Sequence, residues 1–115
     1  MVPARQTKVD EKLLGRVNRL ADMVEYQEGT VVSRTIVDRE TGTVTLFAFA
    51  EGQGLSEHMA PFDALVCMLE GKVRITISGK PFELDAGDAI ILPAKKPHAL
   101  QAISRFKMML TMIRA

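Results

Sequence analysis

The sequence predicts one all-β domain of antiparallel strands, a sandwich or barrel, preceded by a short N-terminal helical segment. From residue 29 onward, runs rich in β-branched residues alternate with turn residues, roughly every ten positions. No helical pattern separates these runs, which excludes a parallel sheet with crossover helices. The 115 residues, 47% apolar and 25% charged, are sufficient for a single domain with its own core. We therefore assign residues 1–28 to a tail and short helix, and residues 29–115 to the barrel.

The N-terminal segment is polar up to about residue 12 and then changes character. Its apolar residues recur at helical spacing: Leu13, Leu14, Val17, Leu20, Ala21 and Val24. This spacing predicts a short helix over residues 13–24, with Gly15 as its weak point. The apolar face of that helix needs a surface to pack on, either the barrel or a neighbouring subunit.

The strands of the barrel are bounded by turn residues. Gly42 ends the turn DRETG, Glu70-Gly71 is a tight hairpin signal, and Gly79 and Gly87 lie in the next two turns. Between these turns we expect strands at 30–37, 44–50, 56–60, 64–70, 72–78, 81–85, 89–92, 98–104 and 106–113.

Charge and composition exclude several classes of partner. The net charge is +1 and the basic residues are scattered, so the sequence predicts no binding to nucleic acid. No apolar run is long enough to span a bilayer, and the N-terminus lacks the apolar core of a signal peptide. Cys67 is the single cysteine and cannot form an internal disulfide. We expect a cytoplasmic protein without a membrane partner.

Two strands are apolar on both faces, namely ALVCMLE at 64–70 and FKMMLTMI at 106–113. In a barrel only one of the two faces points into the lumen, so the other face needs a separate cover. A partner subunit is the expected cover, which predicts a homodimer.

The stretch from Gly52 to Ala102 contains both histidines of the chain, His58 and His98, among turn residues at regular spacing: Gly52, Gly71, Gly87 and Pro93. This spacing resembles the cupin family of small double-stranded β-helix (jelly-roll) barrels. Gly52, His58 and Gly71 match the first motif of the family. The second motif is matched in register by Gly87, Pro93 and His98. The resemblance covers about residues 30–113. It implies a jelly-roll barrel whose histidines point into the lumen.

In active members of that family, three histidines and one glutamate converge on a metal. This chain has alanine at two of those four positions, Ala60 and Ala64, and keeps only His58 and His98. Asp63 and Glu57 lie one position away from the lumen-facing parity, so neither replaces the lost carboxylate. Lys95 and Ala102 replace the glycine and the asparagine of the second motif. The cofactor therefore stays open: a divalent metal held by two histidines, or none.

A small-molecule pocket is the other expectation for the lumen. By parity from the histidines, the inward-facing residues are small or flexible and apolar, and the predicted pocket is His58, Ala60, Ala64, Val66, Met68, His98, Leu100 and Ala102. The last strand adds either Met108, Leu110 and Met112 or Met109, Thr111 and Ile113. Cys67 has the opposite parity, which excludes a Cys–His dyad. Burial without a carboxylate predicts lowered pKa values for both imidazoles.

Three functions remain open at this point. The first is a small-molecule-binding barrel built around His58 and His98. The second is a metal-dependent enzyme of the dioxygenase, isomerase or decarboxylase type that uses a reduced two-histidine site. The third is a structural or interaction domain. Lys95 and Lys96 precede His98 at the expected rim, where they solubilise the loop or attract an anionic ligand.

Overall fold

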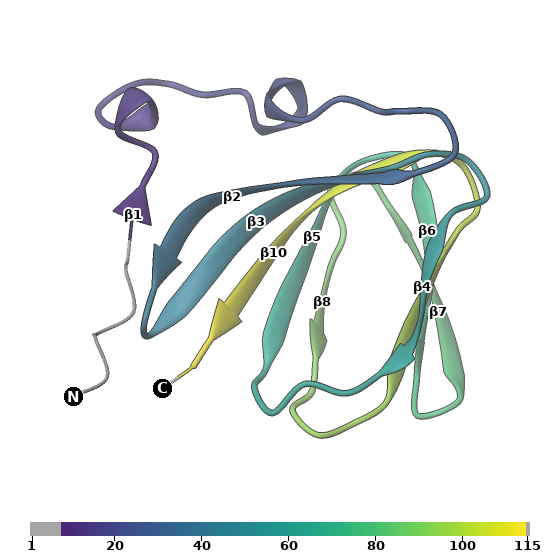
Figure 1. Ribbon diagram of the computed structural model, residues 1–115. Coiled ribbons are helices and arrows are strands. Elements are labelled where there is room, and N and C mark those ends of the chain that lie inside the picture. Colours follow the sequence, from purple (N-terminus) through teal and green to yellow (C-terminus); the bar gives the residue numbers. More distant parts are fainter. Residues whose placement is uncertain (1–7, 115) are drawn as a thin grey trace.

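The computed structural model describes residues 8–114 as two antiparallel sheets that face each other, with the apolar core between them (Figure 1). The first sheet has the strand order β1-β2-β3-β10-β5-β8 and the second has the order β4-β9-β6-β7. The strands are β1 (Lys8–Val9), β2 (Val31–Arg39), β3 (Gly42–Phe49), β4 (Gly54–His58), β5 (Ala64–Glu70), β6 (Lys72–Ile77), β7 (Lys80–Asp85), β8 (Ala89–Leu92), β9 (His98–Ala102) and β10 (Phe106–Ile113). The predicted all-β jelly roll is thereby confirmed.

The N-terminal segment differs from the predicted helix over 13–24. It contains two short 3-10 helices, η1 (Glu11–Leu13) and η2 (Leu20–Met23), joined by an irregular stretch. Gly15 adopts φ +65°, a left-handed conformation that ends any α-helical run. The apolar residues of the second half, Leu20 and Val24, do pack on the sheet, but they do so from a 3-10 turn and an extended residue rather than from an α-helix. The tail was predicted to be polar up to about residue 12. Its residues 1–7 lie outside the described part of the chain, whereas Lys8 and Val9 form β1, which pairs with β2.

The predicted hairpins form where the glycines indicated. Gly71 joins β5 to β6 with φ +81°, and Gly79 joins β6 to β7 with φ +82°. The strand expected at 56–60 lies two residues earlier, at Gly54–His58. Beyond His58 the chain turns toward Pro61, whose ring cannot donate to a strand ladder.

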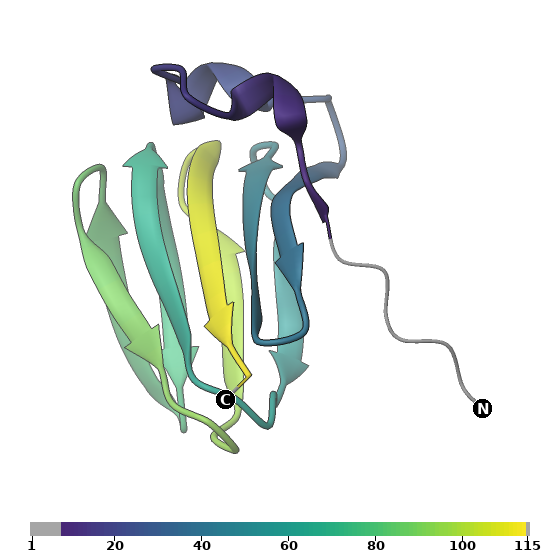
Figure 2. The ribbon, with the colours of Figure 1, turned by 90° about the vertical axis from the view of Figure 1, so that its left-hand side faces the viewer.

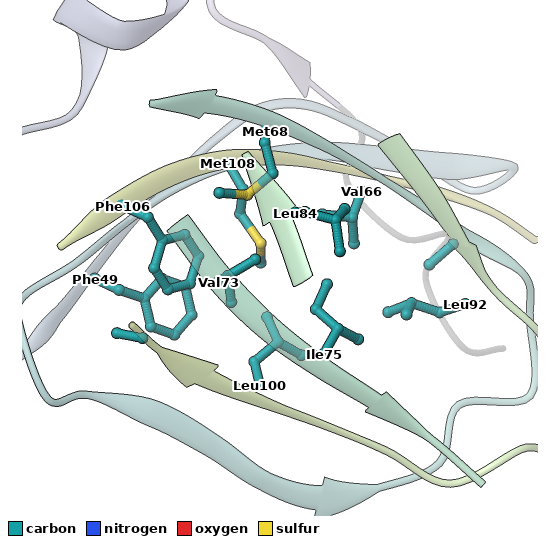
Figure 3. Packing of buried hydrophobic residues seen from close by; sticks show 12 residues of the cluster. Phe49, Val66, Met68, Val73, Ile75, Leu84, Leu92, Leu100, Phe106 and Met108 are labelled. Atoms are coloured by element: carbon teal, nitrogen blue, oxygen red, sulfur yellow. The ribbon is translucent and has the colours of Figure 1, made fainter. Parts of the chain in front are cut away.

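The core contains the inward-facing residues that parity predicted. Val66 and Met68 on β5 lie opposite Leu110 and Met108 on β10, which shows that the last strand turns Met108 and Leu110 inward. Phe49 and Phe106 stack with ring centroids 4.4 Å apart and an interplanar angle of 10°. In Figure 3 this stack lies on one side of the cluster and Leu92 on the other. Apolar side chains therefore fill the space between the sheets.

The outer face of the six-stranded sheet is partly covered by the chain itself. Leu20, Met23, Val24 and Tyr26 pack on outward-facing residues of β2, β3, β5 and β10, chiefly Leu46, Ala48 and Met109. We call residues 10–26 the strap; Figure 2 shows it crossing one end of the sheet. The apolar outer parity of β10 is thus explained in part without a partner subunit. No helix within residues 8–114 has the length and apolar character needed to cross a bilayer.

Candidate functional site at the end of the barrel

The two histidines of the chain meet at one end of the barrel. His58 is the last residue of β4 and His98 is the first residue of β9, and the two are register partners in the antiparallel pair. Their Nε2 atoms lie 3.0 Å apart, and the rings meet edge to face at 69° with centroids 4.3 Å apart. Figure 1 shows this end, where β4 stops and β9 starts, at the bottom of the molecule. The sequence prediction that both imidazoles point to one place agrees with this geometry.

Backbone carbonyl groups orient both rings. The Nδ1 atom of His58 lies 2.8 Å from the carbonyl oxygen of Ser56, and Nδ1 of His98 lies 3.3 Å from that of Lys96. A carbonyl oxygen only accepts, so each Nδ1 carries a proton in these hydrogen bonds. In the neutral ring the proton on Nδ1 leaves a lone pair on Nε2. The two Nε2 atoms are a hydrogen-bond distance apart, 3.0 Å, so one proton lies between them when one ring is an imidazolium. When both rings are neutral, the two lone pairs need a donor or cation that contacts both nitrogens from beside the pair.

The two imidazoles differ in burial. His98 is 4% exposed, and desolvation lowers its pKa; the neighbouring His58 lowers it further, while the Lys96 carbonyl opposes the shift. This direction agrees with the prediction for a buried imidazole. The prediction that His58 is buried as well was wrong: His58 is exposed, because it lies at the end of its strand. The pair thus combines a buried ring, whose pKa is lowered, with one that a solute can reach from solvent.

The other predicted pocket residues lie deeper and are packed. Five of them belong to the buried core cluster: Ala64, Val66, Met68, Leu100 and Ala102. Ala60 lies outside the strands, and its carbonyl oxygen accepts a hydrogen bond from the Lys95 backbone N–H at 2.7 Å. The structure therefore packs these five residues in the core between the sheets rather than around an open lumen.

Carboxylates do not join the histidines in the described part of the chain. Asp63 accepts a hydrogen bond from the Ala94 backbone N–H at 2.7 Å and so ties the loop before β5 to the loop after β8. Within residues 8–114 there is no cluster of three or more His, Cys, Asp or Glu side chains suited to a metal ion. Cys67 alternates with the buried Val66 and Met68 and so lies on the outer face, as predicted.

The comparison with known sequences decides the family. The family profile described as "Cupin domain" matches residues 45–114, more than half of the chain. The chain belongs to the cupin family. No curated protein sequence matches it.

Solved structures agree with this assignment. A conserved protein of unknown function from Streptococcus pyogenes shares 34% identity over 88% of this cupin and 89% of that chain, with a TM-score of 0.84. A cupin superfamily protein from Desulfitobacterium hafniense shares 31% identity over 86% of this chain and 91% of that one, with a TM-score of 0.82. A cupin 2 conserved barrel domain protein from Leptotrichia buccalis shares 40% identity over 82% of this chain but only 46% of that chain, with a TM-score of 0.79.

The metal centre that the family resemblance implies does not fit this cupin's residues. The two Nε2 atoms converge, but Ala60 and Ala64 stand where the other ligands would be. A catalytic zinc has three protein ligands, and non-haem iron has a 2-His-1-carboxylate face. Since residues 8–114 offer no third ligand to complete the pair, we derive no reaction step through a metal.

Lys95 keeps a backbone conformation that the family's second motif assigns to glycine. Its φ is +62°, in the left-handed region that side chains rarely adopt. The conformation lets the Lys95 N–H reach Ala60, which holds the loop 93–97 against the end of β4. A non-glycine residue here costs roughly 1–2 kcal/mol. Strain of this kind tends to persist at binding sites, where the side chain itself is needed.

Sequence reasoning missed a second polar cluster, on the opposite side of the barrel wall. Tyr26 donates a hydrogen bond to Glu70 at 2.6 Å, and Lys107 lies 3.6 Å from the same carboxylate. The Lys107 ammonium also contacts the Ala21 carbonyl and lies 4.9 Å from the centroid of the Tyr26 ring. Glu70 and Lys107 lie 44 and 81 positions after Tyr26 in the sequence, so no local pattern marks the cluster. Its role is to hold the strap on the sheet.

Proposed function

We propose that this cupin binds a small organic molecule at the open end of its barrel, around His58 and His98. The observation that supports the proposal is the convergence of two imidazole nitrogens 3.0 Å apart at an end of the barrel where His58 is exposed to solvent. Because the nitrogens are only 3.0 Å apart, a ligand hydroxyl or ammonium would approach beside the pair and donate its hydrogen to the Nε2 lone pairs from there. Because the deeper lumen is filled by side chains, the ligand would lie on the core rather than within it.

The two lysines beside the site favour an organic anion as the ligand. Lys95 and Lys96 are exposed in the loop that also orients His98. Met59, which is 63% exposed, follows His58 directly and offers apolar surface. A hydroxyl donor, a negative charge and a small apolar body are combined in hydroxy acids and sugar acids. We therefore infer that ligand class, with the imidazoles accepting the hydroxyl proton and the lysines attracting the carboxylate.

The test is an NMR titration of ¹⁵N-labelled, metal-free protein with hydroxy acids, sugar acids and their neutral analogues. The expected result is a shift of both Nε2 resonances with the acids and a weaker effect of the neutral analogues. His58→Gln should weaken binding at least about tenfold, which is the scale of losing one buried hydrogen bond. Ile103→Gln changes an exposed apolar residue just after the far end of β9 from His98; it is the control and should bind within a few-fold of the original.

Metal analysis of the same preparation separates this function from its alternative, a metal-dependent enzyme with a two-histidine site. Near-stoichiometric iron, manganese, nickel or zinc that is lost in the His58→Ala, His98→Ala double variant would support the alternative. Absence of any shift at either imidazole with every acid, at millimolar concentration, would refute the proposed ligand class.

A further inference from the structure

The uncovered part of the six-stranded sheet forms an apolar surface next to the strap. Leu65 on β5 is the direct register partner of Ile91 on β8, and Cys67 is the partner of Ala89 in the next row. These residues lie on the outer face, opposite the buried Ala64 and Val66. Ile91 is 61% exposed, and Leu65 is exposed as well. We call Leu65, Cys67, Ala89 and Ile91 the open face.

The strap carries a second apolar surface without a cover. Its second half packs on the sheet through Leu20, Met23, Val24 and Tyr26. Its first half does not: Val17 is 100% exposed and Leu14 is 59% exposed. Figure 2 shows the strap crossing one end of the sheet while β5 and β8 stay open to the same side. The molecule therefore presents two apolar surfaces side by side that do not touch each other.

The charges beside these two surfaces are opposite in sign. Arg16 and Arg19 flank Val17 on the strap, and both are exposed. Asp63 precedes β5 and Asp88 precedes β8, so an exposed carboxylate lies at each end of the open face. A surface that joins Val17 to two arginines is complementary to one that joins Leu65 and Ile91 to two aspartates. Within a single copy, the second half of the strap is anchored over the other strands, and Val17 has no contact there.

We propose that a second copy of this chain covers the open face with its strap, and that the two copies are related by a two-fold axis. Val17 of each copy would pack on Leu65 and Ile91 of the other, with Arg16 and Arg19 near Asp63 and Asp88. A two-fold axis makes this contact twice, as isologous dimers do. The arrangement covers both apolar surfaces at once. It is independent of the ligand site, which lies at the end of the barrel.

Light scattering on the full chain at micromolar concentration tests the proposal. The wild type should be a dimer. Val17→Asp and Ile91→Asp should each weaken the dimer at least about tenfold, because each places a charge in an apolar contact. Met59→Asp, at a residue of similar exposure (63%) outside the proposed interface, should leave the dimer unchanged. A monomeric wild type, or a dimer that withstands either aspartate variant, would overturn the proposal.

Charge reversal identifies which surfaces meet. The double variant Arg16→Glu, Arg19→Glu places glutamates of the strap opposite Asp63 and Asp88 of the other copy. The variant Ala89→Lys places a lysine of the open face opposite the arginines of the strap. Each variant alone should therefore dissociate into monomers. Neither change removes a side chain that carries a hydrogen bond in the folded chain. Mixed together, the two variants should form a heterodimer tighter than either homodimer. In an alternative dimer the straps of the two copies would contact each other, so that arginine faces arginine in the wild type and glutamate faces glutamate in the double variant. Such a dimer would be unchanged by the reversal, and an unchanged dimer in the Arg16→Glu, Arg19→Glu variant would refute the strap-on-sheet contact.

Discussion

The Nε2 atoms of His58 and His98 face each other across 3.0 Å, although 40 residues separate them in the chain. Each ring is turned into this position by a carbonyl oxygen two residues before it, from Ser56 and from Lys96. The two side chains therefore form one hydrogen-bonding pair at the end of a filled barrel.

His98 should titrate below its ordinary pKa of 6.5, because burial disfavours the imidazolium. A pKa lowered by folding means that the unfolded chain binds the proton first as the pH falls. The contribution of His98 to stability is thus complete above pH 6.5 and is lost as the pH falls through its folded-state pKa. A ¹H–¹⁵N titration of the two histidines, with His98→Gln for assignment, checks this. Protonation of His98 at or above pH 6.5 would contradict it.

Lys95→Gly should stabilise the fold and weaken ligand binding. Glycine removes the left-handed strain at φ +62°, while its greater freedom in the unfolded chain offsets part of the gain. We expect a net gain of about 0.5–1 kcal/mol in urea denaturation. Binding of the anionic ligand should fall several-fold. Lys96→Gly, in the same loop without a positive φ, is the control and should not gain stability. A Lys95→Gly variant that binds as tightly as the original would remove Lys95 from the proposed site.

Gly71→Ala should cost clearly more stability than Gly79→Ala. Both glycines have nearly equal φ, +81° and +82°, so the conformational strain of a side chain is the same, roughly 1–2 kcal/mol. A Cβ at Gly71 would also collide with the Arg105 carbonyl oxygen and lie 2.7 Å from the Phe106 Cα, whereas nothing lies within 4 Å at Gly79. Chemical denaturation of the two variants measures the difference. Equal losses would show that the β5–β6 turn can move away from β10.

Phe106→Ala should destabilise the protein by about 3–5 kcal/mol. Its ring is fully buried and stacks on Phe49 at 4.4 Å, so truncation leaves a cavity in the core. Ile103→Ala, three residues earlier and exposed, should change the free energy of unfolding by less than about 0.5 kcal/mol. Guanidinium melts of both variants provide the measurement. A Phe106 loss close to that of Ile103 would mean that this end of the core collapses around the missing ring.

Tyr26 should resist ionisation well beyond the usual pKa of tyrosine, about 10. Burial raises the pKa of its hydroxyl, and so does its hydrogen bond to Glu70; Arg105 opposes the shift. The unfolded chain therefore releases this proton first, and stability falls as the pH rises above about 10. Tyr26 is the single tyrosine and the chain has no tryptophan, so absorbance at alkaline pH reports on it alone. Glu70→Gln should bring the transition to lower pH; ordinary titration in the original chain would mean that the strap is not held as described.

Local patterns were sufficient for the strands and for the direction of their side chains. Alternation along β5 places Ala64, Val66 and Met68 inward and Cys67 outward, and the structure has them so. Turn glycines such as Gly71 located the hairpins. Alternation could not decide which face of β10 points inward, because both faces are apolar. The pairing with β5 decides it, since Met108 lies opposite the inward-facing Met68. The strap was misread as a helix because apolar spacing does not specify the backbone. Leu20 and Val24 pack on the sheet from a 3-10 turn and the extended residue after it, whereas Val17 is fully exposed.

The sequence by itself determined the all-β barrel and the shared parity of its two histidines, while the resemblance to cupins implied that Ala60 and Ala64 stand at metal-ligand positions. These follow from rules that act over a few residues: strand alternation, turn chemistry and the identity of a side chain at a given position. Tertiary structure alone decided that the lumen is filled, that His98 is buried while His58 is exposed, and that the strap covers only part of the sheet. Each of these depends on how side-chain volumes from distant strands fit together, which no stretch of the sequence contains.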